Sequence, residues 1–575
     1  MGNPQRKLCR LTESSQHEEL RRRVRGLTTV LYKFISGEQL SKQPRSADSL
    51  LLYVATLLTC GDQCDNEAKK VISVAASVEL GVPVRILVVA QNTHVRSSVE
   101  TISLKVVEER HSSLDEVVTG PANRDFLGHV SDVQAALSAF DARATNVDDQ
   151  LRALEVFFLS RSFPKFVARF NEDTRLCCGK RLFEVIRQWK PSRSRRRREI
   201  PLPKLVNWPD WLIQLEALPP IPSKLVNGEV KCEFSDDTKR IWSEVLVAFL
   251  VGVDKAIGDV MLARDKGDKG EEEAHRAMFQ LNDWCRMLYD FVYWDAGIVP
   301  FLLTKTTMLN DMVTPTMLHP EIASTLDDDE SAELRFEPGE RKGPRVLRYL
   351  ERVLAWHEAL DTLCSNKITP GLLKNIIIGV IEVPRFLSSA MTLPEICDEF
   401  FVRFSHMMIY YEPVVETLAN HSSDAFLGCV HAEATLMGIL NYYGHYSAHA
   451  SQDAGIQNPW TMQQVVQPIT EAEGTVIAVS KKCCWCCNWL SQNLESKFTL
   501  PGTHGVIYPW DPPKVGVSET VLKRLEDKLW EKLYAKVLSF VPIYTFRSDE
   551  SPKWCLTDPR ADMSGFITVE FLPSY

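Results

Sequence analysis

The sequence has no long hydrophobic run: its 575 residues contain no stretch of about 18 uninterrupted apolar residues. The longest candidate, residues 71–90, is interrupted by Glu79 and Arg85. The N-terminal residues lead into charged residues, whereas a signal peptide would continue into an apolar segment. We therefore expect an intracellular protein, cytoplasmic or nuclear, that does not bind or span a membrane.

An excess of positive charge is also missing. Lys and Arg total 66 against 75 Asp and Glu, so the net charge is −9, which argues against a chain that coats nucleic acid with its whole surface. There is no G-x-x-x-x-G-K-[ST] loop and no G-x-G-x-x-G after a predicted strand. This excludes the usual sites for nucleoside triphosphates and dinucleotides.

Cysteine, in contrast, is plentiful. The 15 cysteines are an odd number, and no secretion signal accompanies them, so we expect reduced thiols in an intracellular setting. Four of the cysteines fall within residues 483–487. This clustering makes that segment the first candidate for a functional site.

Composition and periodicity divide the chain into five regions. Exposed loops interrupt the helical pattern near 190–235 and 320–345, where proline, arginine and acidic runs occur. The regions are a polar N-terminal tail with at most one helix (1–47), a helix plus β-hairpin (48–93), a mainly helical region (94–425), a second α/β region (426–545) and a C-terminal extension (546–575).

Hydrophobic periodicity also predicts the elements within these regions. The β-branched runs 71–78 and 84–90 predict a hairpin that is apolar on both faces, as in a sheet covered by helices. Residues 475–480 and 505–508 resemble further strands, and residues 518–540 a long amphipathic helix. Apolar residues three and four apart predict helices near 96–109, 148–160, 239–264, 272–293, 345–363 and 395–420.

Two short motifs carry the candidate chemistry. H-A-E at 431–433 opens a helical run, and C-C-W-C-C at 483–487 follows a strand and opens another helix. One His and two Cys at C-x-x-C spacing supply three ligands to Zn²⁺ and leave the fourth tetrahedral position for water. A Glu two residues after the His is better placed to move the proton of that water than to ligate the ion. Together, H-x-E and C-x-x-C are the signature of zinc deaminases.

With these motifs the sequence resembles the cytidine-deaminase-like superfamily, and more closely its OTT-like branch, a toxin-related group expanded in fungi. S-K-K-C-C-W-C-C at 480–487 is similar to the branch's S-K-x-x-C-x-x-C, and H-G-V-I-Y-P-W at 504–510 is similar to its H-G-x-x-Y-P-x-W tail. The resemblance covers roughly 425–545. It implies that His431, Cys484 and Cys487 are zinc ligands and that Glu433 is the general acid/base.

The cysteine cluster leaves the ligand register open. The broader superfamily has Pro directly before the first ligand Cys, where this chain has Cys483, so C-x-x-C fits either 483/486 or 484/487. The Ser-Lys pair at 480–481 favours Cys484 and Cys487. The alternative to a reactive site is a group of buried thiols or a closed metal site.

The resemblance also predicts how the chain is divided. In the deaminase fold a helix and two antiparallel strands precede the H-x-E helix, and the second strand typically ends at an Asn that touches the substrate sugar. That pattern occurs here far upstream, in 48–93, with Asn92 after the second strand. We therefore expect 71–90 to pair in one sheet with 475–480. The alternative is a local hairpin that uses residues 375–383.

The predicted fold class is α/β, a three-layer deaminase-like mixed sheet flanked by helices and split by a large, mostly α-helical insertion. The predicted function is that of a zinc-dependent hydrolytic deaminase acting on a nucleobase in a nucleotide or nucleic acid, with Glu433 as catalytic residue. Asn92, His504 and Trp510 are the expected substrate contacts, with Trp510 as a stacking surface for a base; the alternative for His504 and Trp510 is packing at the domain edge. The alternative function is a non-catalytic helical interaction protein that keeps a structural zinc.

Overall fold

The computed structural model describes the greater part of the chain. The described residues are 4–34, 49–60, 71–77, 85–92, 101–108, 112–120, 124–190, 205–207, 223–227, 229–235, 237–309, 341–365, 376–384, 389–420, 428–445, 455–470 and 475–540. Residues 546–575 and the arginine run at 193–198, which belong to predicted regions, lie outside them.

A five-stranded mixed sheet in the order β3-β7-β2-β1-β8 forms the centre of the molecule. β1 (Ile72–Ala76) and β2 (Ile86–Gln91) form an antiparallel hairpin. β8 (Ile477–Val479) pairs antiparallel with β1, with Ala478 opposite Val74. The predicted pairing between the 71–90 hairpin and 475–480 is therefore present, across about 400 residues of chain.

Two more strands extend the sheet on the side of β2. β7 (Ile377–Glu382) runs parallel to β2, and β3 (Ser103–Val106) runs antiparallel to β7. Residues 375–383, the alternative source of a local hairpin, thus add one strand to the upstream hairpin and do not replace it. β3 corrects the expected helix near 96–109.

Side chains of the sheet alternate between two apolar cores. Val74 and Val89 belong to the core on one face, whereas Ala75 and Val88 belong to the core on the other. β8 follows the same rule, because Ala478 lies in the first core and its neighbours Ile477 and Val479 lie in the second. Both faces are covered, which explains why these strands are apolar throughout.

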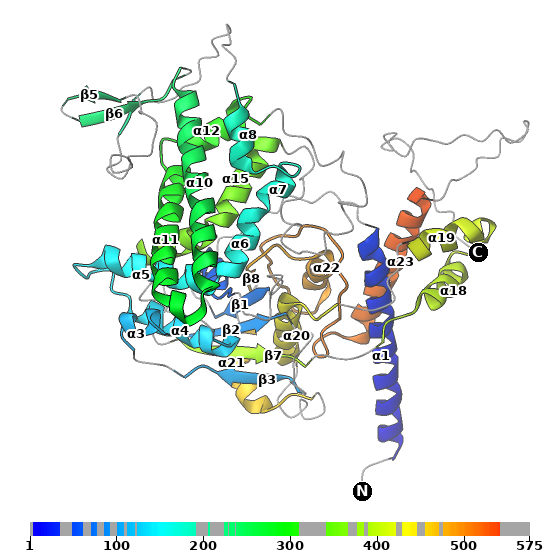
Figure 1. Ribbon diagram of the computed structural model, residues 1–575. Helices are drawn as coiled ribbons and strands as arrows, with labels where there is room; N and C mark the ends of the chain where they lie inside the picture. Colours follow the sequence, from blue (N-terminus) through cyan, green and yellow to red (C-terminus); the bar gives the residue numbers. More distant parts are fainter. Residues whose placement is uncertain are drawn as a thin grey trace, which may run out of the picture.

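The helix that precedes β1 and the helices of the large middle region cover the first face (Figure 1). α2 (Ser49–Leu57) contacts β1 and β8, and α10 (Lys239–Arg264) and α11 (Glu271–Tyr293) pack along each other. The remaining elements of this part are α3 (Leu114–Val118), α4 (Phe126–Ala139), α5 (Val147–Arg161), α6 (Phe163–Asn171), α7 (Asp173–Leu176), α8 (Leu182–Gln188), η1 (Gly267–Gly270), α12 (Ile298–Lys305), α15 (Lys342–Val353) and α16 (Ala355–Ser365).

The second face is covered by helices from the C-terminal part. α20 (Ala432–His445) contacts β1, β2 and β8, and α21 (Pro459–Thr470) contacts β2 and β3. α22 (Trp485–Asn493) packs on α20. α21 occupies the chain between the H-x-E and cysteine motifs. Beyond these lie α18 (Leu393–Arg403), η3 (Ser405–Tyr410), α19 (Tyr411–Asn420) and α23 (Glu519–Phe540).

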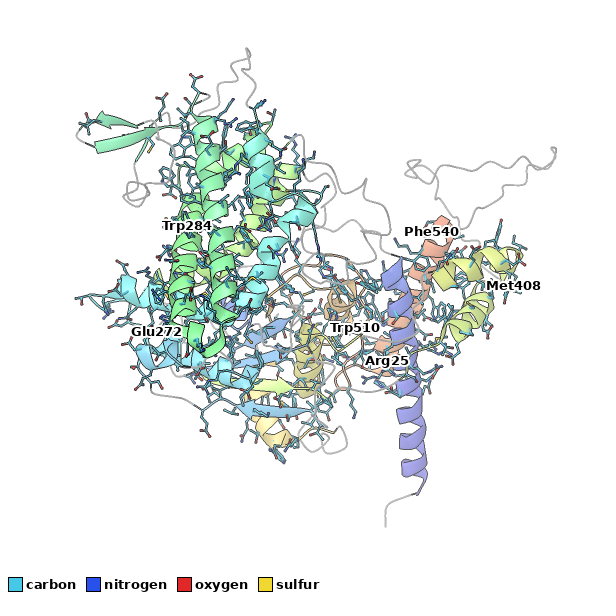
Figure 2. The ribbon with its side chains drawn as sticks, in the orientation of Figure 1. Arg25, Glu272, Trp284, Met408, Trp510 and Phe540 are labelled. Atoms are coloured by element: carbon cyan, nitrogen blue, oxygen red, sulfur yellow. The ribbon has the colours of Figure 1, made fainter. Side chains whose placement is uncertain are left out.

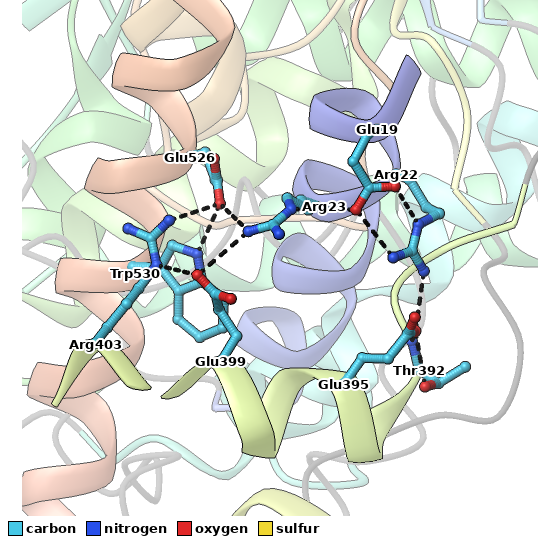
Figure 3. A network of polar contacts seen from close by, with 9 residues as sticks. All are labelled: Glu19, Arg22, Arg23, Thr392, Glu395, Glu399, Arg403, Glu526 and Trp530. Carbon is cyan, nitrogen blue, oxygen red and sulfur yellow. Dashed lines mark hydrogen bonds and ion pairs between the residues drawn. The ribbon is translucent and has the colours of Figure 1, made fainter. Parts of the chain in front are cut away.

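The N-terminal region is not a polar tail, because it contains the long helix α1 (Pro4–Lys33), which lies beside α23 (Figure 1). Leu20, Val24, Leu27 and Leu31 recur at three- and four-residue spacing and are all buried. Its arginines form ion pairs with neighbouring helices, Arg22 with Glu395 of α18 among them (Figure 3). Helix α1 is thus an integral part of the second core.

Most predicted helices are present, and two loop or strand assignments need correction. The segments predicted near 148–160, 239–264, 272–293 and 518–540 correspond to α5, α10, α11 and α23. The predicted loop at 190–235 contains a small antiparallel sheet of β4 (Leu205–Asn207), β6 (Glu229–Glu233) and β5 (Ser223–Val226). Residues 505–508 are not a strand. None of the helices in the described residues is long and apolar enough to cross a membrane.

Candidate metal centre

The H-x-E motif lies at the start of the buried helix α20. The carbonyl oxygen of His431 accepts a hydrogen bond from the backbone N–H of Thr435 at 2.9 Å, so His431 is the residue that caps the first turn. Glu433 follows within that turn. The His431 Nδ1 atom lies 3.7 Å from the Glu433 Oε1 atom and 3.6 Å from the Cys487 Sγ atom.

The cysteine motif places two sulfur atoms at the start of α22. Cys484 is the N-cap of this helix, and its Sγ atom accepts a hydrogen bond from the backbone N–H of Cys487 at 3.4 Å. The spacing of three residues brings both side chains to the same side of the helix start. A C-x-x-C at a helix N-terminus therefore directs two sulfurs at one point.

The two motifs meet in one buried group. The candidate ligand atoms of His431, Glu433, Cys484 and Cys487 all lie within 4.8 Å of one another. Cys483 and Cys486 are not part of this group, although both are buried. Of the two registers that the sequence leaves open, the structure therefore brings the 484/487 pair to His431.

The backbone of Cys483 explains why proline is absent before the first of these sulfurs. Its N–H donates to the carbonyl oxygen of Gly502 at 2.9 Å, and its own carbonyl accepts from the backbone N–H of His504 at 3.1 Å. Proline has no N–H and would lose the first bond. Cys483, which stands where the superfamily has Pro, therefore joins the start of the cysteine motif to residues 502–504 through two backbone hydrogen bonds.

The group is strongly polarised. Burial lowers the pKa of His431, but the adjacent Cys484 sulfur outweighs it and holds that pKa well above its usual range. Burial raises the pKa of Cys484, yet hydrogen bonds from Cys486 and Cys487 and the charge on His431 hold it well below its usual range. The sulfur of Cys484 is thus stabilised as a thiolate, the form that binds a metal.

Glu433 has one oxygen that the described residues leave unused. Its Oε2 atom is buried and has no hydrogen-bond partner among them. A buried polar atom without a partner is costly, so its presence in a native site indicates a ligand or a water molecule there. The other oxygen of the same carboxylate, Oε1, lies 3.7 Å from the His431 Nδ1 atom, so Oε2 belongs to a side chain of the metal group.

Asn92, the predicted substrate contact, lies beside the H-x-E helix. Its Oδ1 atom accepts a hydrogen bond from the backbone N–H of Ala432 at 2.7 Å, although 340 positions separate the two residues. Its backbone N–H donates to the carbonyl oxygen of Val71, which continues the β1–β2 ladder. Asn92 thus fixes the start of α20 against the end of the upstream hairpin.

Residues 502–511, which include the H-G-V-I-Y-P-W segment at 504–510, connect the two ligand-bearing elements. The backbone N–H of Trp485 donates to the Val506 carbonyl at 2.9 Å, and that of Asp511 donates to the Cys429 carbonyl at 3.0 Å. The first bond lies at the start of α22 and the second lies two residues before His431. We call residues 502–511 the clamp segment.

The structure places His504 and Trp510 differently. The His504 ring lies 5.4 Å from the Tyr508 ring, which in turn lies 6.4 Å from the His431 ring, measured between centroids. His504 is thus one ring removed from the metal group. Trp510 is 0% exposed, so neither face of its indole is open to a base. This placement corresponds to the packing alternative.

The sequence analysis does not identify the residues of α1 that contact the clamp segment. Thr28 Oγ1 accepts from the Trp510 N–H at 3.1 Å, and Arg25 binds Asp511 at 2.9 Å. Figure 2 shows Arg25 and Trp510 in the same part of the molecule. The apolar period of α1 marks it as a helix that packs on another surface, but no local pattern identifies that surface.

A family model described as OTT_1508-like deaminase matches residues 430–514, which contain both ligand motifs and the clamp segment. The match supports the likeness of this part of the chain to the OTT-like deaminase branch of the cytidine-deaminase-like superfamily. No curated protein and no solved structure matches the chain.

Proposed function

We propose that the protein is a zinc-dependent hydrolytic deaminase that acts on a nucleobase within a nucleotide or nucleic acid. The observation that carries the proposal is the convergence of the His431, Glu433, Cys484 and Cys487 ligand atoms within 4.8 Å. The match of the same residues to a deaminase family supports the reaction class.

The residues present fit a zinc ion. One imidazole nitrogen and two sulfurs are a donor set that zinc accepts, and tetrahedral bonds of about 2.0–2.3 Å hold ligands about 3.3–3.8 Å apart. The 3.6 Å separation of His431 Nδ1 and Cys487 Sγ falls in that range. The unpartnered Oε2 of Glu433 supports a site that also takes water or substrate.

His431, Cys484 and Cys487 would hold the ion, which supplies the Lewis acidity that lowers the pKa of water towards neutrality. Glu433 Oε2 would accept one proton from the attacking water and deliver it to the ring nitrogen. It would then carry the second proton of that water, from the new C–OH group, to the amino group, which leaves as ammonia as the C–N bond breaks. Asn92 and His504 are the proposed substrate contacts. The Asn92 amide is fixed through Oδ1, which leaves its Nδ2 atom to donate to a sugar hydroxyl.

We further propose that residues 48–93 and 426–545 are the two parts of one deaminase-like domain, and that 94–425 is a mainly helical insertion. Support comes from the β1–β8 pairing and from the Asn92 bond to Ala432, which join the two parts at the sheet and at the site. Most helices of the insertion share, with α2, the core on the face of the sheet opposite α20, whereas α18 and α19 belong to the core on the α20 side. Such an insertion can enlarge the scaffold while the site elements keep their places.

The test combines zinc analysis with ammonia release. The purified chain is assayed for bound zinc and for ammonia release from bases, nucleosides, nucleotides and single-stranded RNA and DNA. Replacing Glu433→Gln should retain zinc and slow deamination by at least about 100-fold, because the isosteric amide cannot accept the proton. Glu412→Gln, a change at an exposed glutamate of α19, is the matched control and should leave the rate unchanged.

Two outcomes would contradict the proposal. An unchanged rate in Glu433→Gln assigns the proton transfer to another group. If the Glu433→Gln variant loses zinc and the wild-type chain releases ammonia from none of the substrates, Glu433 is a fourth ligand of a closed site. The near-complete burial of the four residues, at 8% exposure or less, is the observation that favours this non-catalytic alternative.

A further inference from the structure

We propose that Thr28 of helix α1 is a positioning residue for the metal centre: it holds the clamp segment, which in turn holds the two ligand-bearing elements. The inference rests on the proposed function for the identity of the metal. It gives the N-terminal helix, some 400 residues upstream of the matched deaminase region, a role in positioning the ligands of the site.

The clamp segment is hydrogen-bonded to both ligand-bearing elements, so its position affects theirs. It is tied to the residue before Cys484 by the Cys483–Gly502 bond and to the start of α22 by the Trp485–Val506 bond. Its far end is tied to the strand-like residue Cys429, which precedes His431. A shift of this segment would therefore change the separation of the sulfurs and the imidazole.

The segment has little regular structure of its own, so other elements must support it. At Trp510 that support comes from α1: Thr28 Oγ1 accepts the Trp510 N–H at 3.1 Å and donates within its own helix to the Val24 carbonyl at 2.9 Å. Both Thr28 and Trp510 are 0% exposed, so no water can replace the hydroxyl as acceptor.

Asp511, the next residue, is held by the same helix. Its Oδ1 atom pairs with Arg25 at 2.9 Å and with Arg21 at 3.2 Å, and both side chains are buried. Arg21, Arg25 and Thr28 are four and three residues apart, so they lie along one face of α1. This face carries the clamp segment.

Helix α1 is itself firmly held, as a support must be. Arg23 pairs with Glu526 of α23 at 3.2 Å, and Arg403 of α18 pairs with the same carboxylate at 3.0 Å. The Trp530 indole N–H donates to Glu526 as well, at 3.1 Å. These contacts join α1, α18 and α23 in one network (Figure 3).

The experiment compares neighbouring threonines. Thr28→Val keeps the shape of the side chain but removes the acceptor for Trp510. Thr29→Val is the matched control, because Thr29 is also buried and, among the described residues, its hydroxyl bonds only within α1, to the Arg25 carbonyl at 2.8 Å. Thr28→Ser restores the hydroxyl. The measurement is the rate at which the zinc-loaded full chain loses zinc to an excess of a chromogenic chelator.

We expect zinc release from Thr28→Val to be about 10-fold faster than from the wild type, by analogy with the loss of outer hydrogen bonds at metal sites. Thr29→Val and Thr28→Ser should release zinc at the wild-type rate. Equal release rates from Thr28→Val and Thr29→Val would overturn the proposal. The readout needs no substrate, so an absence of ammonia release refutes the proposed function without affecting this comparison.

Discussion

Asn92 combines two hydrogen-bonding groups with separable tasks. Its Oδ1 atom caps the N-terminus of α20 through Ala432, whereas no described residue is paired with its Nδ2 atom. Asn92→Asp keeps an acceptor, which is favourable at a helix N-terminus, and removes the donor. Zinc content and stability should stay close to wild type, while KM should rise about 3- to 10-fold through loss of one hydrogen bond.

The companion variant Asn92→Ala removes both groups. It should raise KM similarly and, in addition, lower the free energy of unfolding by about 1 kcal/mol through loss of the cap. Steady-state kinetics and urea denaturation separate the two effects. An Asp variant with an unchanged KM would remove Asn92 from the substrate site and leave it a cap alone.

At the same scale, the residues of the metal group could be chosen from the sequence because their spacing is local. H-x-E spans one helical turn, and C-x-x-C spans another, so each motif defines half of the site without knowledge of the fold. Thr28 and Trp510 are 482 positions apart, and nothing in either local sequence indicates the other. The aromatic ring of Trp510 predicts either a stacking surface for a base or packing at the domain edge, and its burial favours packing.

Among the elements, α10 and the other long helices of the middle region were predicted well, whereas the N-terminal helix α1 and the short strand β3 were not. α10 begins and ends at the predicted residues 239 and 264, because 26 residues give the apolar period many repeats. β3 has only four residues, of which one is buried and two are exposed, and its neighbourhood fits a helical period equally well. Its pairing with β7 decides the outcome, and β7 is more than 270 residues away.

Helix α20 approaches the chain after the clamp segment so closely that two glycines are required. Gly516 has a φ of +72°, and a Cβ atom there would overlap the carbonyl oxygen of Gly438 in α20. Gly516→Ala should therefore lower the free energy of unfolding by about 3 kcal/mol or more and displace the ligand helix. Chemical denaturation measures the first effect and zinc release the second.

Gly258→Ala provides the comparison for this prediction. Gly258 lies within α10, far from the metal group in sequence, and a Cβ atom there would meet nothing within 4 Å. Because alanine favours a helix more than glycine does, this variant should gain up to about 1 kcal/mol. A Gly516→Ala variant as stable as Gly258→Ala would show that α20 can move away from residue 516 without cost.

For the whole molecule, the arrangement follows from a sheet that needs cover on both faces. β1, β2 and β8 are too apolar to face water, so the middle helices and the C-terminal helices take one face each. Strands at 72–91 and at 477–479 can pair across the long interval between them, because loop-closure entropy grows slowly with length. The order of the motifs along the chain therefore predicts the β1–β8 pairing, whereas the residues between the two strands contain no local pattern that indicates it.

Zinc should accordingly stabilise the upstream hairpin, although no proposed ligand lies near it in sequence. We expect zinc bound at about 1,000 times its Kd to stabilise the folded site by about 4 kcal/mol. Because α20 contacts β1 and β2 and is bonded to Asn92, amides of residues 72–76 and 86–91 should exchange more slowly in the zinc-bound chain than in the metal-free chain. Hydrogen–deuterium exchange measures this, with α11 at residues 271–293 as the internal reference. Protection confined to residues 428–445 and 476–493 would contradict a single domain assembled from the two distant segments.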